Sequence, residues 1–180
     1  MATWIAFLRG INVGGNSLLP MKELTALMEK SGCADIRTYI QSGNVVFSAT
    51  KAQAQQLPKH IGAHVMKTRG FTPGVLVLGT AELKRAADAN PYPKATPEPK
   101  SLHLFFLGAA PKSPDLDALN RIKTASEEFI LDGKVFYLHA PNGVGTSKLA
   151  ARAEKLLGVP ATARNWRTVT TVLTMATEKT

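Results

Sequence analysis

Two glycine-bearing loops, each between a predicted strand and a predicted helix, are the places where this sequence could bind an anion. Backbone N–H groups near a helix N-terminus attract phosphate and carboxylate groups. The first loop follows an apolar strand and leads into a helix that opens at Pro20. Its candidate ligand-binding residues are Arg9, Gly10, Asn12, Gly14, Gly15 and Asn16.

This first loop carries part of a phosphate-binding motif. Gly10 and Gly15 have the spacing of a P-loop, but Asn16 stands where that motif places its lysine. Without the lysine, the loop lacks the charge that reaches the β- and γ-phosphates, so nucleotide hydrolysis is not predicted. Two interpretations stay open: a binding loop, or two glycines at positions 14 and 15 that let the chain reverse tightly.

The second loop, residues 142–148, ends in Ser147 and Lys148 at the start of another predicted helix. Its flexible backbone, the hydroxyls of Thr146 and Ser147, and the lysine would all donate hydrogen bonds to an oxyanion. The alternative is an N-cap at Thr146 or Ser147 followed by a solvated lysine. A lysine in a first helical turn opposes the helix dipole unless an anion lies nearby, which favours binding.

Four more residues are candidate contacts. Gln41 and Asn44 flank a predicted turn at Ser42 and Gly43, where an asparagine commonly satisfies local backbone groups instead. Arg164 and Asn165 open the last predicted helix and point either outward to a ligand or inward to lock two domains together.

The sequence nominates no metal site, cofactor or catalytic residue. His60 and His64 have metal-ligand spacing, but the glutamate of an H-E-x-x-H motif is absent. No paired carboxylates and no Ser/His/Asp arrangement are recognisable. Cys33 is the single cysteine, and we expect an inert, partly buried thiol.

The elements that would position these residues fall into two similar sets. Residues 1–80 predict a strand, a helix with proline at its first position, a hairpin, a second helix and a short strand. This order, βαββαβ, is the ferredoxin-like split motif. The expected ranges are 3–8, 20–31, 35–41, 44–48, 51–69 and 75–78, with Pro58 delaying or kinking the second helix.

A linking helix and a proline-rich stretch, residues 81–100, separate this domain from a second one over residues 101–180. The second domain repeats βαββα, with its first helix capped by Ser113 and opening at Pro114. Instead of a strand as the sixth element, residues 161–164 lead into a helix with Trp166 on its apolar face. The predicted fold is therefore α+β, with two ferredoxin-like α-β plaits in tandem and a modified C-terminal helix in the second.

The predicted central strands of the first domain limit how it could bind RNA. Residues 4–8 and 45–47 are apolar on both faces, whereas RNA-recognition plaits expose aromatic and basic side chains there. We expect the face opposite the helices to be covered by the other domain, the C-terminal helix or a second subunit.

Composition permits an anionic partner. The 22 Lys and Arg against 13 Asp and Glu give a net charge of +9, and the pI is near 9.9. No apolar run approaches the roughly 20 residues that cross a bilayer, so no membrane partner is predicted. The N-terminus lacks a basic segment before its apolar residues, and Arg9 interrupts them too early for a signal peptide. We therefore expect a cytoplasmic protein.

Four segments together resemble the bacterial family called domain of unknown function 1697. They are LRGINVGG (residues 8–15), YIQSGNVVF (39–47), GTSKL (145–149) and TARNW (162–166). The resemblance covers almost the whole chain and implies the double plait, but it implies no activity. Ala163 stands where threonine is the commoner residue of the family.

Three functions remain as hypotheses. The first is a binding module in which the loops hold an anionic ligand such as a nucleotide or a nucleic-acid backbone. A second is an enzyme that acts on a small anionic metabolite. The third is an interaction protein or homodimer in which the same residues serve packing.

Overall fold

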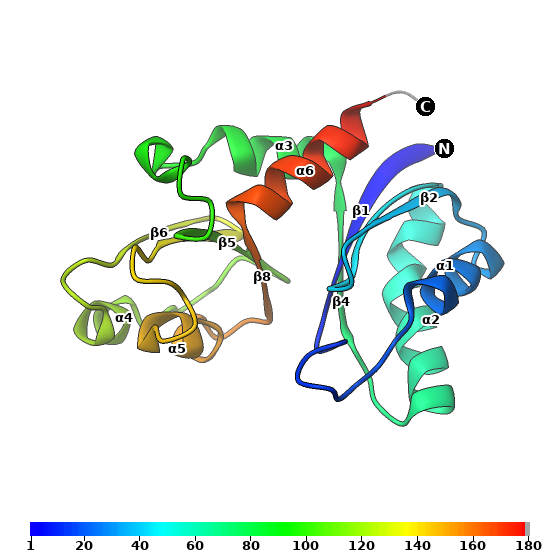
Figure 1. Cartoon of the computed structure of the whole chain (residues 1–180), viewed down its shortest axis with the longest axis horizontal. Helices are drawn as coiled ribbons and strands as arrows, with labels where there is room; N and C mark the ends of the chain where they lie inside the picture. Colours follow the sequence, from blue (N-terminus) through cyan, green and yellow to red (C-terminus); the bar gives the residue numbers. More distant parts are fainter. Residues whose placement is uncertain (179–180) are drawn as a thin grey trace. The chain divides into compact units, whose positions relative to one another are not determined.

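The computed structural model describes residues 1–178 and has a mixed α+β fold with two four-stranded antiparallel sheets (Figure 1). Contacts within the chain divide it into two compact units. Unit 1 combines Met1–Arg85 with the C-terminal segment that begins at Thr171, and unit 2 is Ala86–Thr170. The change of unit after Arg85 falls inside the predicted linking segment, residues 81–100. The predicted bounds placed the C-terminal segment in the second domain, although the C-terminal helix was one of the three covers expected for the first sheet.

Unit 1 has the element order βαββαβ, and its strands lie in the order β2-β3-β1-β4. Ala6 in the central strand β1 pairs with Val45 of β3 on one side and with Val77 of β4 on the other. The elements of this part of the chain are β1 Ala2–Arg9, α1 Met21–Lys30, β2 Ala34–Tyr39, β3 Asn44–Ala49, α2 Lys51–Arg69 and β4 Gly74–Gly79.

Local signals explain where the second helix begins and ends. Thr50 caps α2 in a capping box, because its hydroxyl accepts from the Gln53 amide while the Gln53 side chain accepts from the Thr50 amide. Gly70 ends the helix in the left-handed conformation, with φ at +78°. The helix starts at Lys51 and runs on past Pro58, so the proline does not delay it.

The core of unit 1 lies between the sheet and helices α1 and α2. Inward-facing strand residues pack there against apolar helix residues, as alternation on a strand and 3.6-residue periodicity on a helix require. The buried members of this core include Leu8, Val45, Phe47, Leu24, Met28, Leu57 and Ile61.

The opposite face of this sheet is also buried, as predicted. Ile5 and Phe7 of β1 are 0% exposed although they point away from the helical core. Arg37 of β2 donates a hydrogen bond from Nη2 to the carbonyl of Met175, so the last turns of α6 (Trp166–Thr177) lie on this face. A base-stacking platform of the RNA-recognition type is therefore not exposed on β1.

Unit 2 repeats the same strand arrangement, with the order β6-β7-β5-β8. The remaining elements of the chain are α3 Thr80–Asp88, the 3-10 helix η1 Pro93–Ala95, β5 Leu102–Leu107, α4 Leu116–Ile122, β6 Glu128–Asp132, β7 Val135–His139, α5 Lys148–Leu157, β8 Ala161–Asn165 and α6.

Strand β8 corrects the prediction that the second domain lacks a strand as its sixth element. Its residues pair antiparallel with β5, from Ala161 opposite Leu107 to Asn165 opposite His103. The strand was missed because its small and polar side chains show no apolar alternation, whereas the pairing uses backbone groups that every residue carries. The second unit therefore completes the order βαββαβ.

A second correction concerns helix α4. The predicted cap was Ser113 with Pro114 as first residue, but the helix begins at Leu116 and Asp115 is its N-cap. The Asp115 carboxylate accepts a hydrogen bond from the Ala118 amide at 2.9 Å. Aspartate and serine are nearly equal as N-caps, so sequence preference alone could not separate the two positions.

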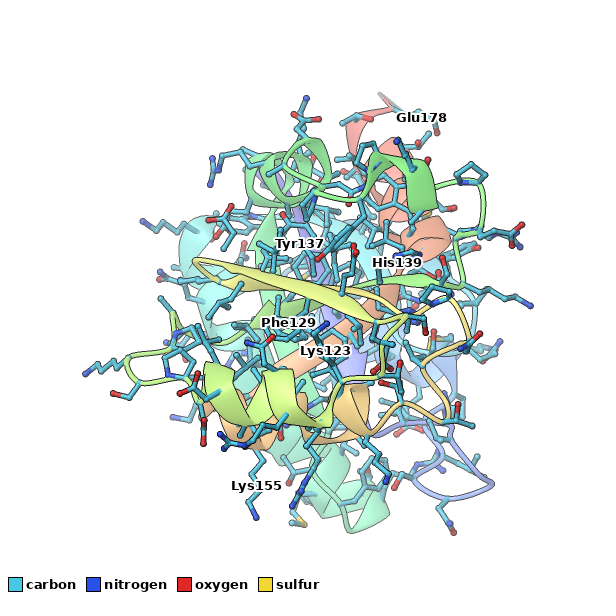
Figure 2. All side chains as sticks on the ribbon, turned by 90° about the vertical axis from the view of Figure 1, so that its left-hand side faces the viewer. Lys123, Phe129, Tyr137, His139, Lys155 and Glu178 are labelled. Carbon is cyan, nitrogen blue, oxygen red and sulfur yellow. The ribbon has the colours of Figure 1, made fainter. Side chains whose placement is uncertain are left out.

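Aromatic side chains fill the core of unit 2. Phe105 and Phe136 meet edge to face, with ring centroids 5.6 Å apart, and Phe129 stacks on Phe136 at 5.2 Å. On the other face of β7, the buried Tyr137 (Figure 2) donates to the Ala86 carbonyl at 2.8 Å. Burial raises the pKa of Tyr137 to about 12, so the phenol keeps this proton at neutral pH.

Among the described residues, no helix has both the length and the apolar character that a membrane span requires.

Candidate functional site

The glycine-rich segment after β1 is a small hairpin. Val13 and Asn16 form a β-bridge, and the Asn16 amide donates to the Val13 carbonyl at 3.2 Å. Gly14 and Gly15 lie between them with φ of +61° and +76°, the left-handed values that a two-residue type I′ turn requires. The Asn12 amide donates to Ser17 at 3.1 Å, so these two amides are used inside the hairpin. This geometry agrees with chain reversal, the second interpretation of the glycines.

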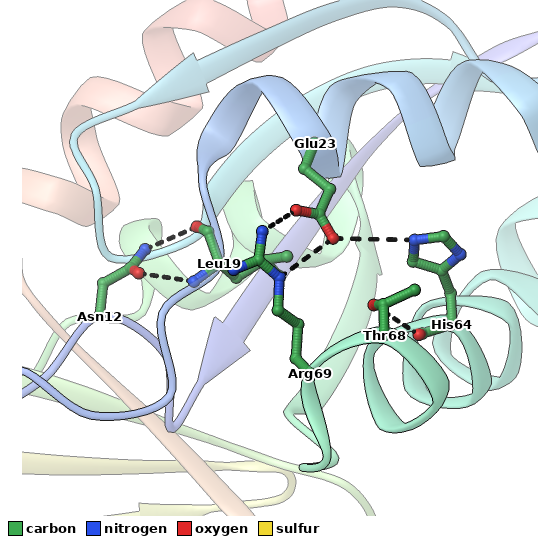
Figure 3. A network of polar contacts seen from close by, with 6 residues as sticks. All are labelled: Asn12, Leu19, Glu23, His64, Thr68 and Arg69. Atoms are coloured by element: carbon green, nitrogen blue, oxygen red, sulfur yellow. Dashed lines mark hydrogen bonds and ion pairs between the residues drawn. The ribbon is translucent and has the colours of Figure 1, made fainter.

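Asn12 joins this hairpin to the next loop of the sheet. Its Nδ2 donates to the carbonyls of Leu19 at 2.9 Å and of Gln41 at 2.8 Å, and its Oδ1 accepts from the Leu19 amide at 2.8 Å. Figure 3 shows the reciprocal pair with Leu19. Both side-chain hydrogens of Asn12 are thereby used, so the residue positions the β1–α1 and β2–β3 loops side by side.

Asn44 and Gly43 stabilise the turn between β2 and β3. Asn44 is 0% exposed and donates from Nδ2 to the Tyr39 carbonyl at 3.1 Å and to the Ser42 hydroxyl at 3.0 Å. Gly43 has φ of +78°, and a Cβ there would lie 2.6 Å from the Cβ of Leu8. The local role that we considered for Asn44 therefore accounts for its contacts.

Arg9 and Gln41 lie at the same end of unit 1 and are exposed. Gly74, the partner of Arg9 in β4, leaves room for the arginine, because a Cβ there would lie 2.6 Å from Arg9 Cγ. Among the six predicted residues of the first loop, Arg9 and Asn16 thus have exposed charged or polar side chains, while Asn12 serves the loop itself.

Sequence reasoning missed three exposed apolar residues at this end. Val13, Leu18 and Ile40 are 69%, 55% and 54% exposed, and we refer to them as the apolar tip. Val13 follows Asn12 in the sequence, and Leu18 and Ile40 precede Leu19 and Gln41, whose carbonyls accept from the Asn12 side chain, so all three lie at this end of unit 1. Ile40 has φ of +50°, a strained value for a β-branched residue. The sequence signal that could have found them is a large apolar residue next to turn-forming residues, as at Val13 and Ile40.

In unit 2, the second predicted loop meets helix α5 as expected. Ser147 is the N-cap, is 6% exposed, and accepts from the Ala150 amide at 3.0 Å. Its own amide donates to the Val144 carbonyl at 3.1 Å, so its hydrogen-bonding groups serve the helix start. Lys148 is the first helical residue, is exposed, and stands in a first turn without an acidic residue. Thr146 beside it is exposed as well.

Arg164 and Asn165 come from β8 and have different roles. The Asn165 side chain accepts from the Thr168 amide at 2.9 Å and so caps α6. Arg164 is half-buried and donates from Nη1 to the Ala163 carbonyl at 2.9 Å. Burial lowers the pKa of Arg164 to about 10, which leaves the guanidinium charged at neutral pH.

His64 takes part in an ion-pair network rather than in a cluster of metal ligands. Glu23 of α1 accepts from Arg69 of α2, and the His64 Nε2 lies 3.8 Å from the same carboxylate (Figure 3). The hydrogen bond from Arg69 lowers the pKa of Glu23. Within residues 1–178, no group of three His, Cys, Asp or Glu side chains could hold a metal ion.

Two further titratable groups are buried. Cys33 is 6% exposed, and burial raises the pKa of its thiol, which fits an unreactive cysteine. Burial lowers the pKa of His103 in β5 to about 4, and its buried Nδ1 has no hydrogen-bond partner among the described residues. The neutral, largely enclosed ring of His103 fits a packing role in β5.

Comparison with known proteins adds two findings. A family model described as "Protein of unknown function (DUF1697)" matches residues 1–137. The structure of SP0830, a conserved bacterial protein from Streptococcus pneumoniae, is similar with a TM-score of 0.67 and 21% sequence identity over 97% of this chain and 98% of that chain. No curated protein matches the sequence. At this identity the structural likeness establishes a shared fold.

Proposed function

We propose, for a chain that belongs to the DUF1697 family of proteins of unknown function, a role in binding an anionic, phosphate-bearing ligand such as a nucleotide or a nucleic-acid backbone. The observation that carries the proposal is the position of Lys148. It is an exposed cation in the first turn of α5, a helix of ten residues whose first turn has no acidic side chain. The helix dipole disfavours a lysine there, and a bound anion would offset that cost.

The distribution of charge around this loop supports the proposal. No Asp or Glu occurs over residues 133–153, while Lys134, Lys148 and Arg152 lie in that stretch. Residues 1–22 also lack acidic side chains and contain Arg9 and Lys22. A local excess of positive charge draws anions over about 10 Å at 0.1 M salt.

The other predicted site residues receive different roles within this proposal. Lys148 and Arg164 would supply charge to a ligand at unit 2, and Arg9 would supply it at the first loop of unit 1. Exposed Asn16 and Gln41 would add polar contacts at the first loop. Residues whose side chains or backbone conformation hold the loops serve as positioning residues, namely Gly10, Asn12, Gly14, Gly15, Asn44, Ser147 and Asn165.

Melting temperatures with nucleotides, polyphosphates and short RNA and DNA oligomers test the proposal. A ligand at 100 times its dissociation constant stabilises the native state by about 2.7 kcal/mol. Lys148→Ala should abolish that shift, while Lys155→Ala, which removes an exposed lysine from the last turn of the same helix, should keep it. Equal shifts in the two variants would overturn the site, and ligand turnover would favour the enzyme hypothesis.

A second candidate function, self-association, rests on the apolar tip. Exposed apolar clusters commonly mark protein–protein contacts. Light scattering should show a dimer that Ile40→Asn dissolves, since asparagine tolerates the positive φ but removes the apolar contact. Leu116→Asn changes an exposed leucine of unit 2 and serves as the control. A monomer at all concentrations would exclude this function.

We also propose the fold type of the two units. The element order βαββαβ and the strand orders of the two sheets support a ferredoxin-like plait in each unit. The division into domains 1–80 and 101–180 and the cytoplasmic location stay predictions. Such plaits host many functions, so the fold adds nothing to the choice of ligand.

A further inference from the structure

Unit 2 contains a pocket that the proposed function does not use. Its volume is about 520 Å³, within the range of roughly 300–1,000 Å³ that holds small ligands. It lies between the segment around η1 and the start of β6, next to the end of β7, where Figure 2 labels His139. The residues that matter for its chemistry are Tyr92, Pro93, Lys94, Ser126, Glu128 and His139.

Ordered backbone holds the walls of this pocket. Glu128 and His139 are direct partners across β6 and β7, so their side chains stand on one face of the sheet. The ring of Tyr92 lies 5.8 Å from that of His139, tilted by 33°. The Tyr92 amide donates to Asn90 Oδ1 at 3.0 Å, and its carbonyl accepts from the Ala95 amide at 3.0 Å.

The pocket combines apolar walls with one charge of each sign. Pro91, Pro93 and Ala95 contribute apolar surface beside the Tyr92 ring. Neither Lys94 nor Glu128 forms an ion pair with another described residue. Burial and, second, the charge of Glu128 raise the pKa of Tyr92 to about 12, so the phenol stays neutral and the carboxylate is the anionic group beside it.

We infer that this pocket binds a small zwitterion with an apolar side chain, the chemical class of the free α-amino acids. Glu128 accepts hydrogen bonds from the ammonium group and Lys94 donates to the carboxylate, because the two side chains offer complementary charges that do not pair with each other. The proline and tyrosine surfaces contact the apolar side chain. Ser126 is less available, since its hydroxyl already lies 3.3 Å from both the Thr124 hydroxyl and Asn142 Nδ2.

Ligand analogues on the unmodified protein give the first test. Amide NMR spectra of the full chain are recorded with L-phenylalanine, L-leucine, phenethylamine, which lacks the carboxylate, and 3-phenylpropanoate, which lacks the ammonium group. We expect an amino acid at millimolar concentration to shift the resonances of Tyr92 and His139, with either truncated analogue binding about tenfold more weakly. The proposal is overturned if neither amino acid shifts these resonances, and this arm requires no variant to fold.

Charge variants give the second test. Glu128→Gln should weaken the binding of L-phenylalanine and phenethylamine about tenfold and leave that of 3-phenylpropanoate unchanged. Lys94→Met should weaken the binding of L-phenylalanine and 3-phenylpropanoate about tenfold and leave that of phenethylamine unchanged. Glu98→Gln and Lys100→Met make the same changes at exposed positions just after η1 and should alter nothing. Unchanged binding in both pocket variants would assign the shifts to another site. Lys148→Ala should not affect this binding, so failure here and failure of the proposed anion site are distinguishable.

Discussion

Asn12 and Gln41 are joined by a hydrogen bond of 2.8 Å from the Asn12 side chain to the Gln41 carbonyl, across 29 positions of sequence. The bond ties the glycine hairpin after β1 to the turn between β2 and β3. A residue that the sequence offers as a ligand contact is therefore part of the support for both loops.

Replacing Asn12 with alanine should destabilise the protein by about 1–3 kcal/mol, because the Leu19 and Gln41 backbone groups lose their partner and alanine tolerates the φ of +53° poorly. Urea unfolding measures the change. Asn16→Ala, at an exposed position of the same hairpin, should cost less than about 0.5 kcal/mol. Equal losses in the two variants would show that the Asn12 bonds do not hold the loops.

Gly43→Ala should be more destabilising than Gly14→Ala. Both glycines have positive φ, which costs about 1–2 kcal/mol for another residue. A methyl group at Gly43 also meets Leu8 Cβ at 2.6 Å, whereas the space around Gly14 is open. The difference between the two unfolding free energies isolates the steric part, and similar values would contradict the close approach of Gly43 to Leu8 of β1.

Ile40→Gly should raise the free energy of unfolding by about 1 kcal/mol. Glycine removes the strain at φ of +50°, and an isoleucine that is 54% exposed loses little burial when it is replaced. Val13→Gly offers no positive φ to relieve and should not stabilise the protein. A fall in thermal midpoint for Ile40→Gly would mean that the isoleucine is held by contacts in solution.

His103 should make the protein less stable as pH falls from 6.5 to 4. Burial lowers its pKa to about 4 in the folded chain from an ordinary 6.5, so the unfolded chain binds more protons in this window. The loss at pH 4 is on the order of 3 kcal/mol. Urea unfolding across this range should show the slope, and His103→Leu should remove it.

Glu23→Gln distinguishes the pH dependence caused by His103 from that caused by the Glu23–Arg69 ion pair. The pKa of Glu23 is lowered from 4.5 by Arg69, so its stabilising contribution is present above that pH and disappears as pH falls below it. This variant should therefore keep the slope between pH 6.5 and 4.5. A slope that survives in His103→Leu and vanishes in Glu23→Gln would reverse the assignment.

Much of the secondary structure follows from local signals. Lys51–Arg69 is a helix over the expected range, and Thr50 and Gly70 mark its ends. The apolar residues on both faces of β1 correctly predicted a sheet buried on both sides. These features depend on residues close in sequence and on the periodicity of apolar residues, and both can be read directly from the sequence.

The site was harder to predict. Asn12 and Asn44 are polar residues in glycine-containing loops, and the sequence offers both as ligand contacts. In the fold, their side chains instead donate to backbone carbonyls, those of Gln41 and Tyr39. The Tyr92–His139 pocket was not predicted at all, because its walls come from segments more than 30 positions apart. Neither segment has a motif that would mark it.

The sequence by itself determined the type and order of nearly all elements, the caps of α2 and α5, and the two loops rich in glycine, because propensity and periodicity act over a few residues. Tertiary structure decided that residues 161–165 form a strand, since β8 exists through its backbone pairing with β5, about 60 positions earlier. It also decided which polar side chains serve the backbone and which, like Lys148 and Glu128, face solvent. Long-range hydrogen bonds and burial make that choice, and they exist only after the chain has folded.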